Sequence, residues 1–193
     1  MKRASLVLTM LMALALAASA GSISGKVSGV SGKSVVYVDT IAGKTFPAPT
    51  QHPVMDQKGM LFQPHILVVE LGTTVDFLNS DSVQHNVNWP YIGDKKAGGG
   101  HNLGTWPKGE KKSWKFDHPG AAPLFCSVHP EMSGYIVVSP TPYFAETDAS
   151  GAFHIKDVPD GSYTVVAWHE GAKTQSKPVT VKGDTTQDFT LTK

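Results

Sequence analysis

Short apolar stretches alternate with glycine, proline and polar turns along the chain from residue 22 to its end. In the central part the clearest stretches are 66–71, 74–78, 112–116 and 134–138. Apolar and polar residues that alternate over four to eight positions are typical of half-buried β-strands. No stretch keeps the spacing of an amphipathic helix for three turns. The pattern therefore predicts an all-β chain.

Strand-like stretches also flank this central part. Two precede it and four follow it, namely 22–27, 34–38, 151–155, 161–168, 177–181 and 186–191. Proline-rich segments at 46–53 and 140–142 separate the flanks from the centre, because proline lacks the N–H that a central strand needs. About fifty residues of short strands make a marginal core by themselves. Pairing of the two leading strands with the tail would give both groups a partner.

Residues 93–107 contain Gly98-Gly-Gly100, His101 and Trp106 and follow no clear alternation. We predict a long irregular loop here. Loops of this length are either functional or disordered. The sequence leaves these two alternatives open.

The first twenty residues predict a secretory signal peptide. Lys2 and Arg3 begin it, an apolar run spans 6–17, and Ala18-Ser-Ala20 ends it with small residues. The run is shorter than the roughly 20 residues that cross a bilayer. We expect cleavage after Ala20, export to the periplasm and no stable membrane insertion. An uncleaved membrane anchor is the alternative.

The charge balance excludes a class of partners. The chain has 17 basic and 16 acidic residues, and the predicted signal peptide holds two of the basic ones and no acidic one. The exported chain therefore has a formal charge of −1. A nucleic-acid-binding surface needs a clear basic excess. We expect no nucleic-acid partner.

The only cysteine, Cys126, lies three residues before His129 and six before Met132. His85 lies 41 residues upstream, followed by an asparagine. One thiolate, two imidazoles and one thioether are the donors of a blue-copper electron-transfer site. An exported protein normally pairs its cysteines, and a bound metal would protect this one from oxidation. The spacing predicts one copper ion held by His85, Cys126, His129 and Met132.

Other interpretations of this cluster remain open. A single cysteine in an exported chain is incidental, intermolecular or bound to something, and each residue taken alone is ordinary core or surface. Structural zinc prefers more thiolates and no thioether. A cysteine nucleophile with a histidine base is a further alternative, although Met132 has no place in it. His65, His101, His118, His154 and His169 lack ligand spacing, and we expect them to be solvated or hydrogen-bonded.

These motifs resemble the cupredoxin family. The resemblance covers about Val54 to Ser139 and is carried by residues 62–81, 83–87, 116–126 and 134–138. The short spacing from cysteine to histidine to methionine is most similar to amicyanin. The resemblance implies a Greek-key β-sandwich with a type 1 copper ion. It also implies an electron carrier rather than an enzyme.

The resemblance further implies roles for neighbouring residues. Asn86 is expected to bond toward Ser127, so that the two ligand segments are tied together. His129, beside Pro130, is expected to be the edge through which electrons pass to transient redox partners. We expect an apolar rim around it, with the candidates Trp89, Pro90, Ala121, Ala122 and Pro123.

The tail resembles a carboxypeptidase-regulatory-like, transthyretin-type β-sandwich. Residues 146–155 and 158–167 look like its middle strands, and 23–27 and 35–38 look like its first two. The prediction is a cupredoxin Greek-key β-sandwich at 53–139, inserted in, or flanked by, a second small β-sandwich at 21–45 plus 143–193, after a signal peptide at 1–20. The nested order is favoured over a contiguous one, since exposed loops tolerate insertions.

The sequence thus predicts a periplasmic, mononuclear type 1 copper protein that carries single electrons between redox partner proteins. A copper carrier or chaperone that delivers the ion to an acceptor is the alternative. A third interpretation is an interaction module without metal, in which the donor set is coincidental.

Overall fold

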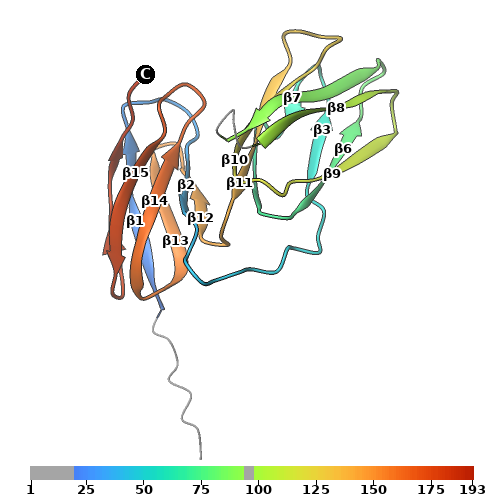
Figure 1. Cartoon of the computed structure of the whole chain (residues 1–193). Helices are drawn as coiled ribbons and strands as arrows, with labels where there is room; N and C mark the ends of the chain where they lie inside the picture. The colour runs from blue at the N-terminus through green and yellow to red at the C-terminus, as the bar shows by residue number, and fades with distance from the viewer. Residues whose placement is uncertain (1–19, 94–97) are drawn as a thin grey trace, which may run out of the picture.

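The computed structural model describes residues 20–93 and 98–193, and every regular element in them is a β-strand (Figure 1). The prediction of an all-β fold is confirmed. The described residues include no apolar helix of membrane-spanning length. The predicted signal peptide falls almost entirely on residues 1–19, which lie outside the described residues. Ala20, the residue before its expected cleavage point, opens the first strand, β1.

Two facing sheets formed by residues 54–139 stand on the right of Figure 1. One sheet has the order β5 (Ile66–Glu70), β11 (Ser133–Ser139), β10 (Gly120–Phe125), β7 (His85–Ile92) and β8 (Gly98–Trp106). The other has the order β4 (Phe62–Gln63), β3 (Val54–Gln57), β6 (Thr74–Asn79) and β9 (Lys111–Lys115). Neighbours such as β7 and β10 are not consecutive in the chain, which is the pattern of a Greek-key sandwich.

The space between these two sheets is filled by strand residues that recur at every second position. Val75 and Phe77 on β6, and Val87 and Trp89 on β7, are buried, as the two-residue period of a strand requires. The rings of Phe77 and Trp89 stack across the core with their centroids 6.3 Å apart. The same cluster includes Cys126 and Met132. The predicted metal ligands therefore border the core of this sandwich.

A second pair of sheets, on the left of Figure 1, combines strands from both ends of the chain. In one sheet β1 (Ala20–Ser28) pairs with β13 (Ala152–Pro159), β16 (Thr185–Thr186) and β17 (Phe189–Thr190). The other has the order β12 (Phe144–Glu146), β2 (Val35–Val38), β14 (Gly161–Trp168) and β15 (Gln175–Val181). The two leading strands thus find their partners in the tail.

Both ends of the chain also share one apolar core. Ile23 and Val36 from the leading strands lie in the same buried cluster as Ile155 and Phe189 from the tail. The backbone at Gly25 approaches the tail so closely that a Cβ there would stand 1.9 Å from the carbonyl oxygen of Gln187. Only glycine permits this contact between β1 and the segment that leads into β17.

The two sandwiches meet along a small apolar contact. Val35 on β2, Ile66 on β5 and Val137 on β11 form a separate buried cluster. Beside it, the rings of Tyr135 and Trp168 meet edge to face with centroids 5.2 Å apart. These side chains come from both sandwiches and are buried against one another. The contact lies on the outer face of the sheet that contains β5 and β11.

The prediction of a long irregular loop over 93–107 is wrong for residues 98–106, while its residues 94–97 lie outside the described part of the chain. Residues 98–106 form β8, which pairs antiparallel with β7 in a register that sets Trp106 opposite His85. The glycines at 98–100 hide the strand from an alternation pattern, because glycine has no side chain to mark a face. A Cβ at Gly100 would lie 2.6 Å from the carbonyl oxygen of Pro90, so the close pairing with β7 itself requires glycine.

Candidate metal centre

The loop between β10 and β11 carries three of the four predicted ligands. Cys126 directly follows β10, and Met132 directly precedes β11. The two strands are antiparallel neighbours, and Phe125 pairs with Ser133 at the base of the loop. His85 is the first residue of β7, the neighbour of β10 on the other side. The four side chains therefore come from one loop and the start of an adjacent strand.

Three donor atoms from these residues converge on one point. Cys126 Sγ lies 3.9 Å from His85 Nδ1 and 3.8 Å from His129 Nδ1. The two Nδ1 atoms are 2.9 Å apart, and all three donors lie within 4.8 Å of one another. Nitrogen and sulfur ligands stand roughly 2.0–2.3 Å from a bound first-row ion such as zinc, so donors that share an ion are about 3–4 Å apart. The cluster has the dimensions of a metal site.

The four side chains of the predicted ligands differ in their exposure to solvent. His85 and Met132 are fully buried, and Cys126 is nearly so. His129 is partly exposed. Met132 packs in the same apolar cluster as Cys126, and its backbone N–H donates to the carbonyl oxygen of His129 at 3.0 Å. The cluster thus has an apolar inner side, with one imidazole at the protein surface.

Asn86 joins the two segments that carry the donors. Its backbone N–H donates to Cys126 Sγ at 3.3 Å, and its Oδ1 accepts the backbone N–H of Ser127 at 3.2 Å. Its Nδ2 donates to Asn102 Oδ1 and to the carbonyl oxygen of Gly104, both at 2.8 Å. A donated N–H stabilises a thiolate, and fixed neighbours hold metal ligands in place.

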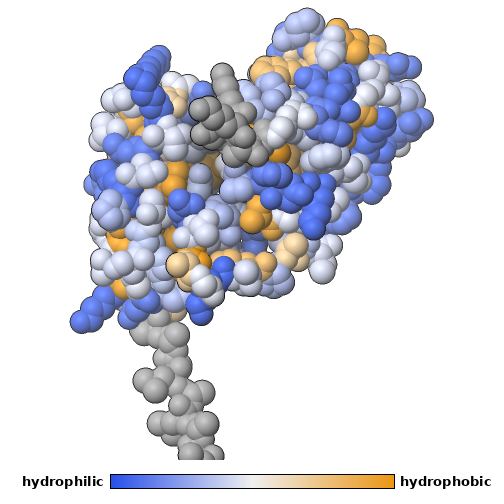
Figure 2. All heavy atoms as spheres, viewed as in Figure 1, coloured by the Kyte–Doolittle hydropathy of each residue, from blue (hydrophilic) through white to orange (hydrophobic). Residues whose placement is uncertain are grey.

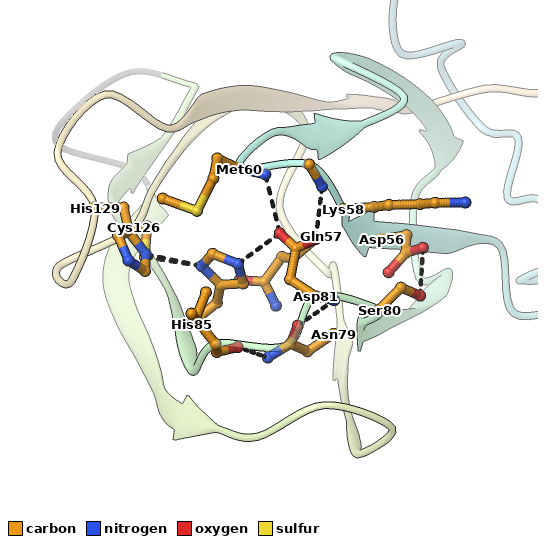
Figure 3. Close-up of polar contacts among 12 residues, drawn as sticks. Asp56, Gln57, Lys58, Met60, Asn79, Ser80, Asp81, His85, Cys126 and His129 are labelled. Carbon is orange, nitrogen blue, oxygen red and sulfur yellow. Dashed lines mark hydrogen bonds and ion pairs between the residues drawn. The ribbon is translucent and has the colours of Figure 1, made fainter.

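A carboxylate that the sequence did not single out contacts the buried histidine. Asp81 Oδ2 lies 2.9 Å from His85 Nε2 (Figure 3). Hydrogen bonds from the backbone N–H groups of Met60 and Gly59, and the contact with His85, lower the pKa of Asp81 to about 2. Its position four residues before His85, in a run of small polar residues at 79–82, is the only signal in the sequence. That signal does not distinguish Asp81 from an ordinary turn residue.

The remaining histidines have other partners. His101 stacks on Trp114 with ring centroids 3.6 Å apart. His154 contacts Ser24 Oγ at 2.7 Å, and His65 contacts Glu170 at 2.9 Å. Among the described residues, the one group of three or more candidate metal-binding side chains is His85, Cys126 and His129.

The predicted apolar rim is mostly wrong. Trp89 and Ala122 are buried on the inner faces of β7 and β10, and Pro123 is buried on the outer face of β10, where it pairs with Tyr135. The exposed large apolar side chains in the described residues are Val54, Leu61, Val83, Phe125 and Val128. On the face drawn in Figure 2, apolar residues form small patches between hydrophilic ones. To assign an apolar rim, one must know which side chains are exposed, and the sequence pattern does not show this.

The donor set distinguishes between metals. Thiolate and thioether are soft donors that favour Cu(I), while imidazole suits several divalent ions. Closed zinc sites have four cysteine or histidine ligands and no thioether. A fully buried methionine beside one cysteine and two histidines therefore fits copper better than zinc.

Two family models match the chain. Residues 50–139 match "Copper binding proteins, plastocyanin/azurin family", and residues 135–192 match "Carboxypeptidase regulatory-like domain". The comparison with curated proteins finds no match.

Solved structures similar to the chain include cupredoxins. Reduced amicyanin with a tryptophan-to-tyrosine substitution is 25% identical and has a TM-score of 0.42, over 48% of this chain and 86% of that chain. Oxidised amicyanin with a proline-to-alanine substitution is 25% identical, with a TM-score of 0.42, over 52% of this chain and 97% of that chain. A purple cupredoxin from Nitrosopumilus maritimus is 24% identical, with a TM-score of 0.38, over 45% of this chain and 99% of that chain.

The first family model spans all four predicted ligands, and the second spans β12 to β17. Residues 50–139 thus match a copper-binding family model, which supports copper as the cofactor, and residues 135–192 match a carboxypeptidase regulatory-like model.

Proposed function

We propose that the protein is a mononuclear type 1 copper protein that carries single electrons, and that it is a carrier rather than an enzyme. His85, Cys126, His129 and Met132 would hold the ion. The observation that carries the proposal is the convergence of one cysteine and two histidine donors within 4.8 Å, next to a fully buried methionine. Bound copper supplies a centre that changes its charge by one electron.

The protein's own contribution is to fix the ligands before the ion binds. The segment that holds Cys126 and the segment that holds His85 are joined through Asn86 at two points, the sulfur and the backbone of Ser127. A site that resists ligand motion keeps the reorganisation that accompanies electron transfer small. This rigidity supports an electron carrier over a copper carrier, which must release its ion.

His129 is the proposed exit for electrons, since it is the partly exposed member of the cluster. Three exposed apolar residues, Leu61, Val83 and Val128, lie close in the chain to Met60, His85 and His129. Leu61 follows Met60, Val83 lies two residues before His85, and Val128 precedes His129. We propose that they form the docking surface for a redox partner protein, in a small and transient interface.

We also propose the domain boundaries and the location. Strand pairing of β1 with β13 and of β2 with β14 supports a second sandwich built from 21–45 and 143–193, around the copper domain at 53–139. The basic and apolar start of the chain supports cleavage after Ala20 and export to the periplasm. Mass spectrometry of the N-terminus of the exported protein tests the cleavage point.

The proposal is tested with the visible absorption spectrum of residues 21–193 after addition of Cu(II), compared with that of Cys126→Ser. An intense blue band in the native sequence alone, which reports a copper–thiolate bond, is the expected result. Reversible one-electron oxidation and reduction without loss of copper is expected next. Tight binding of Cu(I) without colour, followed by rapid transfer to an acceptor, would favour the copper carrier. Absence of copper binding would exclude both functions.

A further inference from the structure

We propose that Asp81 is a positioning residue that orients the imidazole of His85 and lowers the reduction potential of the site. The inference rests on the proposed function. It assigns a role to a side chain outside the set of four ligands. The contacts that carry it are drawn in Figure 3.

The two ring nitrogens of His85 face different partners. Nε2 lies 2.9 Å from Asp81 Oδ2, while Nδ1 faces Cys126 Sγ and His129 Nδ1. The ring is fully buried, so water does not compete for either nitrogen. A carboxylate is an acceptor only, and this contact therefore fixes the proton on Nε2 and leaves the lone pair on Nδ1 for a metal.

The carboxylate is itself held from a second direction. The backbone N–H of Gly59 donates to Oδ1 at 2.7 Å, and that of Met60 donates to Oδ2 at 2.9 Å. Both residues have a left-handed backbone, with φ of 66° and 61°. This conformation turns two successive N–H groups toward one anion. The turn between β3 and β4 thus receives the carboxylate of Asp81.

The backbone of Asp81 is fixed as well. Its N–H donates to Asn79 Oδ1 at 2.9 Å, and Asn79 Nδ2 donates to the carbonyl oxygens of Val83 and Trp106 at 2.8 and 3.0 Å. Asn79 is buried. The segment from 79 to 85 is therefore clamped between β8 and the β3–β4 turn, and Asp81 has little freedom to leave His85.

An anionic acceptor on Nε2–H makes the imidazole a stronger electron donor at Nδ1. A stronger donor stabilises the more highly charged oxidation state, so the reduction potential falls. A neutral amide at the same position accepts a weaker hydrogen bond. Removing the charge of Asp81 is thus expected to raise the potential.

The test compares Asp81→Asn with Asp56→Asn. Asp56 accepts a hydrogen bond from Ser80 Oγ at 2.8 Å, and no dashed line joins it to His85 in Figure 3. The control thus removes one negative charge from a neighbouring position without touching the imidazole. In the copper-loaded proteins, voltammetry should show a rise in potential for Asp81→Asn that is at least threefold that for Asp56→Asn. Asp81→Glu should return the potential toward the original value.

A second readout uses the copper-free proteins. Nitrogen-15 NMR should show His85 protonated at Nε2 in the original chain, with that proton exchanging at least tenfold faster in Asp81→Asn and unchanged in Asp56→Asn. Circular dichroism confirms that each variant is folded. Equal potential shifts in the two variants, or an Nδ1-protonated ring in the original chain, would overturn the inference. A protein that binds no copper contradicts the proposed function. A blue protein whose reduction potential is the same with and without the charge of Asp81 contradicts this inference alone.

Discussion

Asn86 Oδ1 accepts the backbone N–H of Ser127 at 3.2 Å, so one buried side chain links the strand that begins with His85 to the loop that begins with Cys126. The same amide donates to two acceptors in β8. The donor cluster is therefore held together by a residue outside the four predicted ligands. This relationship leads to the first prediction.

Asn86→Ala should weaken both the fold and the copper site. It removes part-buried hydrogen bonds from the Asn86 side chain to Ser127, Asn102 and Gly104, and each such bond contributes about 0.5–1.5 kcal/mol. Copper affinity should fall about tenfold or more, as for other residues that hold metal ligands in place. Denaturant unfolding of the copper-free protein and a copper competition titration measure the two effects.

Ser127→Ala is the matched control for this prediction, because it keeps the backbone N–H that Asn86 accepts. It removes only the contact from Asn88 Nδ2 to Ser127 Oγ, at 3.0 Å on the surface. Its effect on the free energy of unfolding should be within about 0.5 kcal/mol. Equal losses in the two variants would mean that Asn86 does not join the segments.

The strands and the donor cluster could be predicted because their signals are local. Alternating residues mark β5, β6, β9, β11 and β14, and the spacing of Cys126, His129 and Met132 places three donors in one loop. Strand β8 could not be predicted from alternation, since its glycines carry no side chain. It becomes visible only through its pairing with β7.

The partner of Asp81 could not be predicted either. Its carboxylate meets N–H groups that lie 21 and 22 residues earlier in the chain. Aspartate in a turn commonly hydrogen-bonds its own nearby backbone, so the composition of the turn does not indicate a distant partner. Contacts of this kind depend on how two sheets face each other, and no local sequence pattern indicates that arrangement. The apolar rim failed for the same reason, because alternation does not say which face of a strand is covered.

The contact between the two sandwiches provides a second prediction. Tyr135 and Trp168 meet edge to face, and an aromatic pair of this kind contributes about 0.5–1.5 kcal/mol beyond its buried area. A double-mutant cycle with Tyr135→Ala and Trp168→Ala should give a coupling energy in that range in urea unfolding. A cycle that pairs Trp168→Ala with Val75→Ala should give almost no coupling energy, because Val75 lies on β6 in the core between the two sheets of residues 54–139. Additive effects in both cycles would show that the two rings do not interact in solution.

The close approach at Gly25 provides a third prediction. A Cβ there would overlap the carbonyl oxygen of Gln187, so Gly25→Ala must displace the tail from β1. We expect a loss of about 1–3 kcal/mol in the free energy of unfolding, the usual cost of overpacking. The control is Gly99→Ala, where a Cβ would meet nothing within 4 Å. If thermal unfolding shows both variants to be equally stable, β1 does not pack against the tail as described.

The acid stability of the protein depends in part on Asp76. The hydrogen bond from Lys111 Nζ, followed by that from Ser113 Oγ, holds the pKa of this carboxylate below its ordinary value of 3.8. A lowered pKa in the folded state means that the ionised form stabilises the fold. The contribution is complete above the ordinary pKa and is lost as the pH falls through the lower value of the folded protein.

Asp76→Asn should therefore lower the unfolding temperature at pH 7, and the difference from the original chain should shrink as the pH falls below about 3.8. The measurement is a series of thermal melts on copper-free protein between pH 7 and pH 2, so that metal release does not contribute. Asp157→Asn serves as control, because Asp157 is exposed and its φ of 55° is one that asparagine also tolerates. This control should differ little from the original chain at any pH. A deficit in Asp76→Asn that stays constant down to pH 2 would show that the stabilisation does not come from the charge of Asp76.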